Sequence, residues 1–202
     1  MGVRYVVADA RARPAGRRHL RPIFSQGDVT IYENERALPR AYVVSRGSVL
    51  ASPAGALARV RAADFDPRQE VVLEAEQMPP VEGLSAAASR AEVVQHRPNR
   101  VLIDAELKGD GFLVLGDSYD DGWIARADGQ PTAIYRANYA FRAVRLGPGR
   151  HRVEFVYRPR GFVVGAALTL LSLAALAASH LQASAWPRRP RPHGRPGARR
   201  AR

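Results

Sequence analysis

Short runs of β-branched, aromatic and alternating apolar residues fill most of residues 1–159, and they predict strands. The alternation is clearest in the last run, where His151, Val153, Phe155 and Tyr157 share one face and charged residues take the other. We expect strands over residues 3–8, 29–33, 41–45, 70–76, 91–96, 101–107, 112–116, 123–127, 132–136, 141–146 and 151–157.

One helix is predicted between the early strands. Ser52 has the side chain of a good N-cap, and Pro53 suits the first helical position. Leu57 and Val60 then recur on one face of the expected helix. We expect the helix to end near Pro67, because a proline and its preceding residue both disfavour continued helix.

These elements divide into two predicted regions. Residues 1–78 combine strands with the helix and form a small α+β unit in this prediction. The stretch from Met78 to Ala88, with two prolines, a glycine and small residues, is typical of a linker. Over 84–159 the expected strands are separated by Gly, Asp and Pro turn signals, which indicates an antiparallel β-sandwich. The predicted fold class is therefore mainly β (α+β).

A long apolar stretch follows the strands. No residue between Arg160 and Arg188 carries a fixed charge, and residues 161–182 are dominated by Leu, Val and Ala. As a helix, this stretch would extend roughly 33 Å, enough for a bilayer core. We predict one C-terminal transmembrane helix over 161–182 that contacts membrane lipid. The alternative is a buried helix of a soluble protein, which normally has a polar stripe.

The charge distribution predicts an orientation for this helix. The chain of 202 residues has a net charge of +12, and seven of its arginines lie in the last fifteen residues. Such a bias places the Pro/Gly/Arg-rich tail, 183–202, in the cytoplasm as a disordered segment, and residues 1–160 outside it. The tail lacks the aromatic residues of a nucleic-acid-binding arm beyond Trp186, so we expect no nucleic-acid partner.

This orientation conflicts with the start of the chain. Residues 1–16 contain no apolar run of the kind that a signal peptide needs for export. Either the arginine bias does not set the orientation here, or membrane helices upstream belong to the same protein. We favour the second interpretation, in which the chain is the C-terminal piece of a longer polytopic protein.

The motifs of the second region carry a resemblance. Residues 111–173, with the phrase from Asp117 to Trp123 and the run Tyr135 to Arg142, resemble the C-terminal end of the YfhO family of bacterial polytopic membrane proteins. The segments at 2–7, 28–44 and 65–74 resemble the extracytoplasmic region of that family, in the same order.

The resemblance implies a setting in cell-envelope glycosyl transfer at the bacterial plasma membrane. YfhO proteins resemble GT-C glycosyltransferases, which take a sugar from a polyprenyl-phosphate donor and carry their catalytic carboxylate in an early loop. This chain has no counterpart of that loop, so no catalytic residue carries over. We expect an accessory role in positioning an envelope glycan or a lipid-linked sugar. The alternative is a stand-alone membrane-anchored module that binds an envelope glycan or a protein.

Aromatic residues mixed with polar ones mark the candidate binding site. Sugar sites combine exposed aromatic faces with side chains that hydrogen-bond hydroxyl groups. The candidate glycan-binding residues are Asp117, Tyr119, Trp123, Arg136, Asn138 and Tyr139. In the competing interpretation, Trp123 and Phe141 fill the core and Arg136 pairs with Asp120 or Asp121.

Other patterns predict neither a metal site nor a cofactor. The chain has no cysteine, and its five histidines lack metal-ligand spacing; His151 is expected in the core. The aspartates from Asp117 to Asp128 mimic a calcium loop poorly and are better explained as turn caps. Asp64 and Asp66 at the expected helix end, and Asp104 and Glu106 on one strand face, are interpreted as surface residues.

Overall fold

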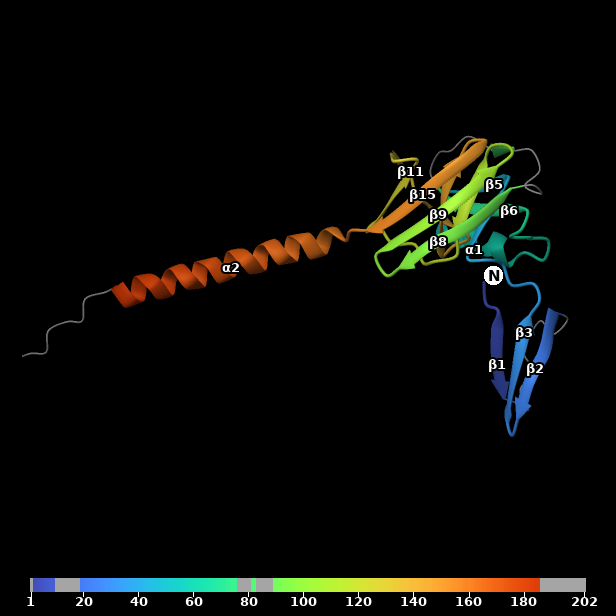
Figure 1. Ribbon diagram of the computed structural model, residues 1–202, viewed down its shortest axis with the longest axis horizontal. Helices are drawn as coiled ribbons and strands as arrows, with labels where there is room; N and C mark the ends of the chain where they lie inside the picture. Colours follow the sequence, from blue (N-terminus) through green and yellow to red (C-terminus); the bar gives the residue numbers. More distant parts are fainter. Residues whose placement is uncertain (1, 10–18, 76–80, 83–88, 186–202) are drawn as a thin grey trace, which may run out of the picture. The chain divides into compact units, whose positions relative to one another are not determined.

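The structure is a computed structural model that describes residues 2–9, 19–75, 81–82 and 89–185, without the side chains of residues 81, 82, 160, 163 and 180–185. The chain forms two compact units, Met1–Pro159 and Arg160–Arg202. The first contains three sheets and a short helix, and the second contains one long helix (Figure 1). Of the tail expected to be disordered over 183–202, residues 183–185 form the end of the long helix, and residues 186–202 lie outside the described residues.

The first sheet has three antiparallel strands in the order β1-β3-β2: β1 (Tyr5–Asp9), β3 (Val29–Asn34) and β2 (Leu20–Gln26). Gly27 has a φ of +55° in the turn between β2 and β3, a conformation that glycine adopts at little cost. Glu33 joins the three strands at one end, because its carboxylate accepts hydrogen bonds from Arg4 next to β1 and Arg21 of β2.

The second sheet has seven strands in the order β4-β10-β14-β13-β6-β5-β7. Only β5 and β6 pair in parallel among the described strands, and helix α1 (Pro53–Arg61) connects them. The strands are β4 (Ala41–Val44), β10 (Gly111–Leu115), β14 (Phe141–Leu146), β13 (Tyr135–Ala137), β6 (Glu70–Glu74), β5 (Arg46–Leu50) and β7 (Val81–Glu82).

The third sheet has five antiparallel strands in the order β12-β11-β15-β9-β8. These are β12 (Gln130–Thr132), β11 (Trp123–Ala127), β15 (Gly149–Tyr157), β9 (Arg100–Leu107) and β8 (Arg90–Arg97). It packs face to face on the seven-stranded sheet, so that Ile103 and Phe155 share one buried cluster with Leu113 and Val144. The predicted mainly β, antiparallel architecture is confirmed.

Strand pairing crosses the boundary that the sequence suggested between 1–78 and 84–159. Val44 of β4 lies opposite Phe112 of β10, and Leu73 of β6 lies opposite Ala137 of β13. The reason is that β10 is buried on both faces, with Leu113 in one cluster and Phe112 in the other. A strand of this kind needs neighbours and covering layers from both parts of the sequence.

Helix α1 begins as predicted and ends earlier. The Ser52 side chain accepts a hydrogen bond from the Gly55 amide at 3.1 Å, and Pro53 takes the first position. The helix stops at Arg61 because Ala62 has extended backbone angles, with ψ at 143°. The expectation of helix as far as residue 66 was wrong.

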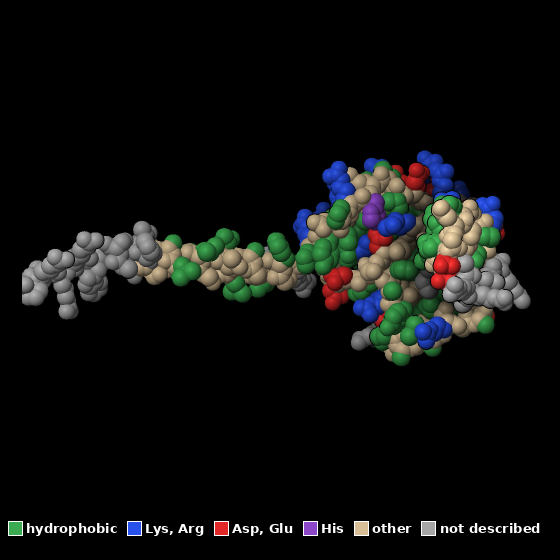
Figure 2. Space-filling view, turned by 90° about the horizontal axis from the view of Figure 1, so that it is seen from below, with side chains coloured by type: hydrophobic (Ala, Val, Ile, Leu, Met, Phe, Trp, Pro, Cys, Tyr) green, Lys and Arg blue, Asp and Glu red, His purple; other side chains and the backbone are tan. Residues whose placement is uncertain are grey.

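The second unit consists of α2 (Arg160–Ala185). Its apolar side chains are exposed, including Phe162 and five leucines between residues 168 and 176, and Figure 2 shows them on both sides of the helix. Within the part of the chain that the structure describes, no helix is long and apolar enough to cross a membrane. The structure therefore does not support the predicted transmembrane span over 161–182.

Candidate functional site

A hollow of about 340 Å³ opens at one end of the five-stranded sheet, and we call it the Trp123 hollow. Five parts of the fold meet there: the β8–β9 hairpin, the segment between β10 and β11, and the strands β11, β14 and β15. Its lining residues are His96, Arg97, Pro98, Asn99, Val101, Asp117, Ser118, Asp120, Trp123, Arg142 and Tyr157.

Arg142 is the buried charge beside this hollow. It is only 1% exposed, and it shares the core-facing side of β14 with Val144 and Leu146. Its Cζ lies 3.7 Å from the centre of the Trp123 ring, a cation–π contact, and its Nη2 donates to Asp117 Oδ2 at 3.2 Å. Burial lowers the pKa of Arg142, and Asp117 acts in the opposite direction. A guanidinium stays protonated in proteins, so a positive charge is fixed under the indole.

Three basic side chains hold the Asp117 carboxylate. Besides the bond from Arg142, Oδ1 accepts a hydrogen bond from Arg40 Nη1 at 2.8 Å, and Oδ2 lies 3.0 Å from His96 Nε2. The Asp117 side chain is 18% exposed and comes from the segment between β10 and β11. Asp117 is thus oriented by groups from three different parts of the chain, and its charge is compensated within the protein.

Trp123 and Tyr157 form the aromatic wall of the hollow. Their ring centres are 5.1 Å apart at an angle of 48°. Because Arg142 covers one face of the indole, Trp123 is half-buried and is not an open stacking platform. A hydrogen bond to Asp120, together with burial, raises the pKa of the Tyr157 phenol. A side chain at Gly122 would meet Tyr157 at 2.7 Å, so glycine is needed for this close approach.

A second hollow of about 310 Å³ lies on another side of Trp123, and we call it the Ile134 hollow. Burial, followed by a hydrogen bond with Asp121, raises the pKa of the Tyr119 phenol in its wall. The Arg136 Cζ lies 4.9 Å from the centre of the Tyr119 ring, and Arg136 pairs with Glu74 at 3.8 Å, not with Asp120 or Asp121. The lining residues are Tyr119, Asp121, Trp123, Ile124, Ala125, Pro131, Thr132 and Ile134.

Asn138 and Tyr139 lie apart from both hollows. Asn138 is 2% exposed. Its side-chain Oδ1 accepts a hydrogen bond from the Val72 backbone amide at 2.9 Å, and its backbone amide donates to the Val72 carbonyl at 2.7 Å. Its Nδ2 also donates to the phenol oxygen of Tyr42, so Asn138 ties β13 to β6 from inside the core. Tyr139 is 42% exposed at a φ of +72°, and Asn138 has a φ of +48°. This burial leaves Asn138 out of reach of a ligand.

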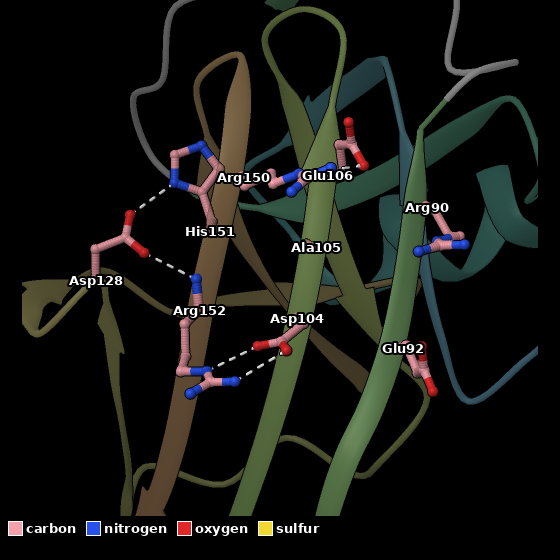
Figure 3. A pocket seen from close by; sticks show the side chains of 9 residues that line it. All are labelled: Arg90, Glu92, Asp104, Ala105, Glu106, Asp128, Arg150, His151 and Arg152. Atoms are coloured by element: carbon pink, nitrogen blue, oxygen red, sulfur yellow. Dashed lines mark hydrogen bonds and ion pairs between the residues drawn. The ribbon is translucent and has the colours of Figure 1, made fainter.

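A charged hollow of about 560 Å³ covers the outer face of β8, β9 and β15 (Figure 3). Arg152 binds both carboxylate oxygens of Asp104, at 2.8 and 3.0 Å, and its backbone amide donates to Asp128 at 2.8 Å. Glu106 lies 3.7 Å from Arg150. These charges neutralise one another across neighbouring strands, which is the expected state of a solvated sheet face.

The remaining sequence candidates have structural partners. Asp64 accepts a hydrogen bond from Arg59, and Asp66 accepts the Arg68 amide in a turn. His151, expected in the core, is half-buried with Nδ1 2.7 Å from Asp128 Oδ2. The Asp66 side chain thus caps the Arg68 amide in the same way as the Ser52 side chain caps the Gly55 amide.

Arg142 is not among the candidate binding residues predicted from the sequence, and the basic group around Asp117 was not predicted either. A signal for Arg142 exists, because it alternates with Val144 and Leu146 at positions that face the core. Arg40 and His96 had no such signal. They lie 77 and 21 residues from Asp117 in the sequence, and only the pairing of β4 with β10 and the β8–β9 hairpin bring them close.

Comparison with known proteins gives a family match that covers the second half of the unit Met1–Pro159 and the beginning of α2. Residues 83–169 match the family described as "Bacterial membrane protein YfhO", which confirms the resemblance over this range. The "Uncharacterized protein YfhO" of Bacillus subtilis (strain 168) is 29% identical over 84 residues, which make up 42% of this chain and 10% of that protein. The matched part thus spans about a tenth of that relative. No solved structure matches the chain.

Proposed function

We propose that this chain, which belongs to the YfhO family through residues 83–169, supplies a carbohydrate-binding region to a bacterial membrane protein concerned with glycosyl transfer in the cell envelope. Its role is accessory: it positions an acceptor glycan or a lipid-linked sugar and carries out no chemistry itself. Residues 1–159 act on the extracytoplasmic side.

The Trp123 hollow is the observation that carries this proposal. Aromatic edges of Trp123 and Tyr157 provide apolar contact area, while Ser118 and Asn99 provide hydroxyl and amide groups at the rim. The carboxylates of the hollow already have donors, since Asp117 is held by three basic groups and Asp120 accepts the Gly122 amide at 2.8 Å. A neutral, hydroxyl-rich ligand with apolar C–H faces fits such a surface.

The exposed helix α2 supports a place at the membrane. A contiguous apolar surface is rarely left open to water, and the five leucines of α2 between residues 168 and 176 are each more than half exposed. We expect the full chain to sediment with bacterial membranes, and a variant lacking residues 161–182 to remain in the supernatant. Sedimentation of the shortened chain to the same extent would show that another surface attaches it.

Glycan binding is tested with the full 202-residue chain in a detergent that has no sugar headgroup. The chain is titrated with N-acetylglucosamine and glucose, and with their β-1,4-linked oligosaccharides, while its NMR spectrum is recorded. We expect the single sugars to cause shifts confined to residues of the Trp123 hollow. The variant Ser118→Trp fills this hollow from an exposed position, and it should lose at least ten-fold in affinity.

The matched control is Arg90→Trp, which places the same bulk in the charged hollow on the outer sheet face. It should bind like the unaltered chain. Equal loss of binding in both variants, or shifts that cluster in the charged hollow, would contradict the proposal. Thermal denaturation of each variant shows that the substitution has left the fold intact.

A further inference from the structure

The segment between β10 and β11 sends its side chains into two hollows. Asp117, Ser118 and Asp120 line the Trp123 hollow, whereas Tyr119 and Asp121 line the Ile134 hollow. Trp123, the first residue of β11, lines both. One short stretch of chain therefore forms a wall common to the two spaces, with the indole at their junction.

The Ile134 hollow has the chemistry of a second sugar subsite. Ile124, Pro131 and Ile134 give it an apolar floor, and the Tyr119 ring, fixed under Arg136, gives it an aromatic side. Thr132 adds a hydroxyl group. Like the Trp123 hollow, it thus pairs flat apolar contacts with a few polar groups, which is how proteins contact the faces and hydroxyls of a pyranose.

The volumes of the two hollows also favour a ligand that occupies both of them over a ligand that occupies only one. The volumes are about 340 and 310 Å³, and each is at the lower limit of the roughly 300–1,000 Å³ of ordinary ligand sites. A ligand that stays in one hollow leaves the other, and the shared edge of Trp123, in contact with water. A ligand that spans both contacts aromatic side chains from Tyr157 to Tyr119.

We infer that the two hollows are neighbouring subsites for an oligosaccharide of at least two units, with one unit on each side of Trp123. This inference rests on the proposed function, and it specifies the length of the glycan. Arg142 and Asp117 contribute as positioning residues, because they hold the indole and the segment that separates the subsites.

The variant Thr132→Trp tests the inference, because Thr132 lies on strand β12 at the edge of the sheet and a large side chain there fills the Ile134 hollow. The full chain in sugar-free detergent is titrated with N-acetylglucosamine, its β-1,4-linked dimer and its tetramer. The cellulose-derived series is titrated in parallel. We expect the dimer to bind at least ten-fold more tightly than the single sugar. Thr132→Trp should remove that gain, whereas Arg90→Trp should retain it.

The outcomes separate this inference from the proposed function. If single sugars bind at the Trp123 hollow and the dimer binds no more tightly, the two-subsite inference fails while the proposed function stands. The inference also fails if Thr132→Trp leaves the dimer affinity unchanged. If no saccharide of either series causes shifts, both fail. Arg90→Trp again serves as the control for added bulk.

Discussion

Two arginine–aspartate pairs in the same unit differ in what surrounds them. Arg152 and Asp104 form two hydrogen bonds on the outer face of the five-stranded sheet, and their side chains are 62% and 48% exposed. Arg142 and Asp117 form one longer bond, but Arg142 is 1% exposed and packs on Trp123. The better hydrogen-bond geometry thus belongs to the exposed pair.

The difference shows that surroundings, not hydrogen-bond geometry, decide what such a pair does. Water replaces the partners of an exposed pair at little cost, so the outer pair is expected to contribute little to folding. A buried charge that loses its partner is much more costly, because water cannot take the place of that partner. Arg142 therefore fixes Asp117 and Trp123, and both line the proposed glycan site.

The largest effect is expected on removal of the buried charge. Arg142→Ala leaves a space under the indole, so it should lower the free energy of unfolding by about 2–5 kcal/mol, as other large-to-small core substitutions do. Asp117 keeps Arg40 and His96 as partners in this variant. Arg142→Met restores part of the lost volume and should recover part of the loss. Denaturation in urea, followed by circular dichroism, measures both. A loss in Arg142→Ala no larger than that of a surface substitution would remove the basis of the comparison.

A buried polar group without charge is expected to give a smaller effect. Asn138→Gly keeps the positive φ but removes the side-chain bond to the Val72 amide, which should cost about 1–3 kcal/mol. Asn138→Ala should cost about 1 kcal/mol more, because alanine resists a positive φ. The same urea denaturation gives both values. Equal stabilities for the two variants would show that backbone conformation at this position has no influence.

The exposed pair should contribute least. In Arg152→Ala, water takes the place of the guanidinium beside Asp104, so the urea midpoint should stay within error of the unaltered chain. The backbone amide of residue 152 still reaches Asp128 in this variant. A clear shift of the midpoint would mean that the outer charge network acts cooperatively, contrary to the comparison.

The pKa values of the carboxyl groups on the outer sheet face give a finer measure of what the exposed pair contributes. The hydrogen bonds from Arg152 lower the pKa of Asp104, while the backbone amide of Arg152, followed by His151, lowers the pKa of Asp128. Since both values are lowered in the folded state, any stability they add is present above the unfolded pKa, near 3.9, and is lost as the pH falls through the folded values.

Carboxyl NMR measures the two groups separately. Arg152→Ala should return the Asp104 pKa toward its ordinary value and leave that of Asp128 low, because alanine keeps the backbone amide. If the pKa of Asp104 is the same with and without the Arg152 side chain, the exposed hydrogen bonds have no effect on the protonation of that carboxyl group.

Much of the strand pattern could be predicted, because alternation and turn residues are local signals. The limits of β11 and β14 agree with the expected ones. By contrast, β2 and β5 were missed. Pro22 and Gly47 weaken their strand signals. Gly47 is explained only by the tertiary structure, since a side chain there would meet the Phe112 ring at 2.6 Å.

The site was predictable in part. Aromatic and acidic residues between Asp117 and Trp123 are close in sequence, and the structure places them around two hollows. The burial and the contacts of each residue were not predictable, because they depend on partners that are distant in the sequence. Asn138 is buried through its bonds to Val72, and one face of Trp123 is covered by Arg142.

The interleaved seven-stranded sheet has a consequence for how the chain reaches this state. β4 pairs with β10, and β6 pairs with β13 as well as with its neighbour β5, so two pairings of this sheet join strands more than sixty residues apart in the sequence. Contacts of such long sequence separation slow folding, since a large loop must close before any contact is gained. As the chain leaves the ribosome, β4 remains without its partner until β10 has been made, and β6 lacks one of its two partners until β13 has been made. Their edges are open to other chains in that interval, so we expect the yield of this protein to rise when the nascent chain is protected during synthesis.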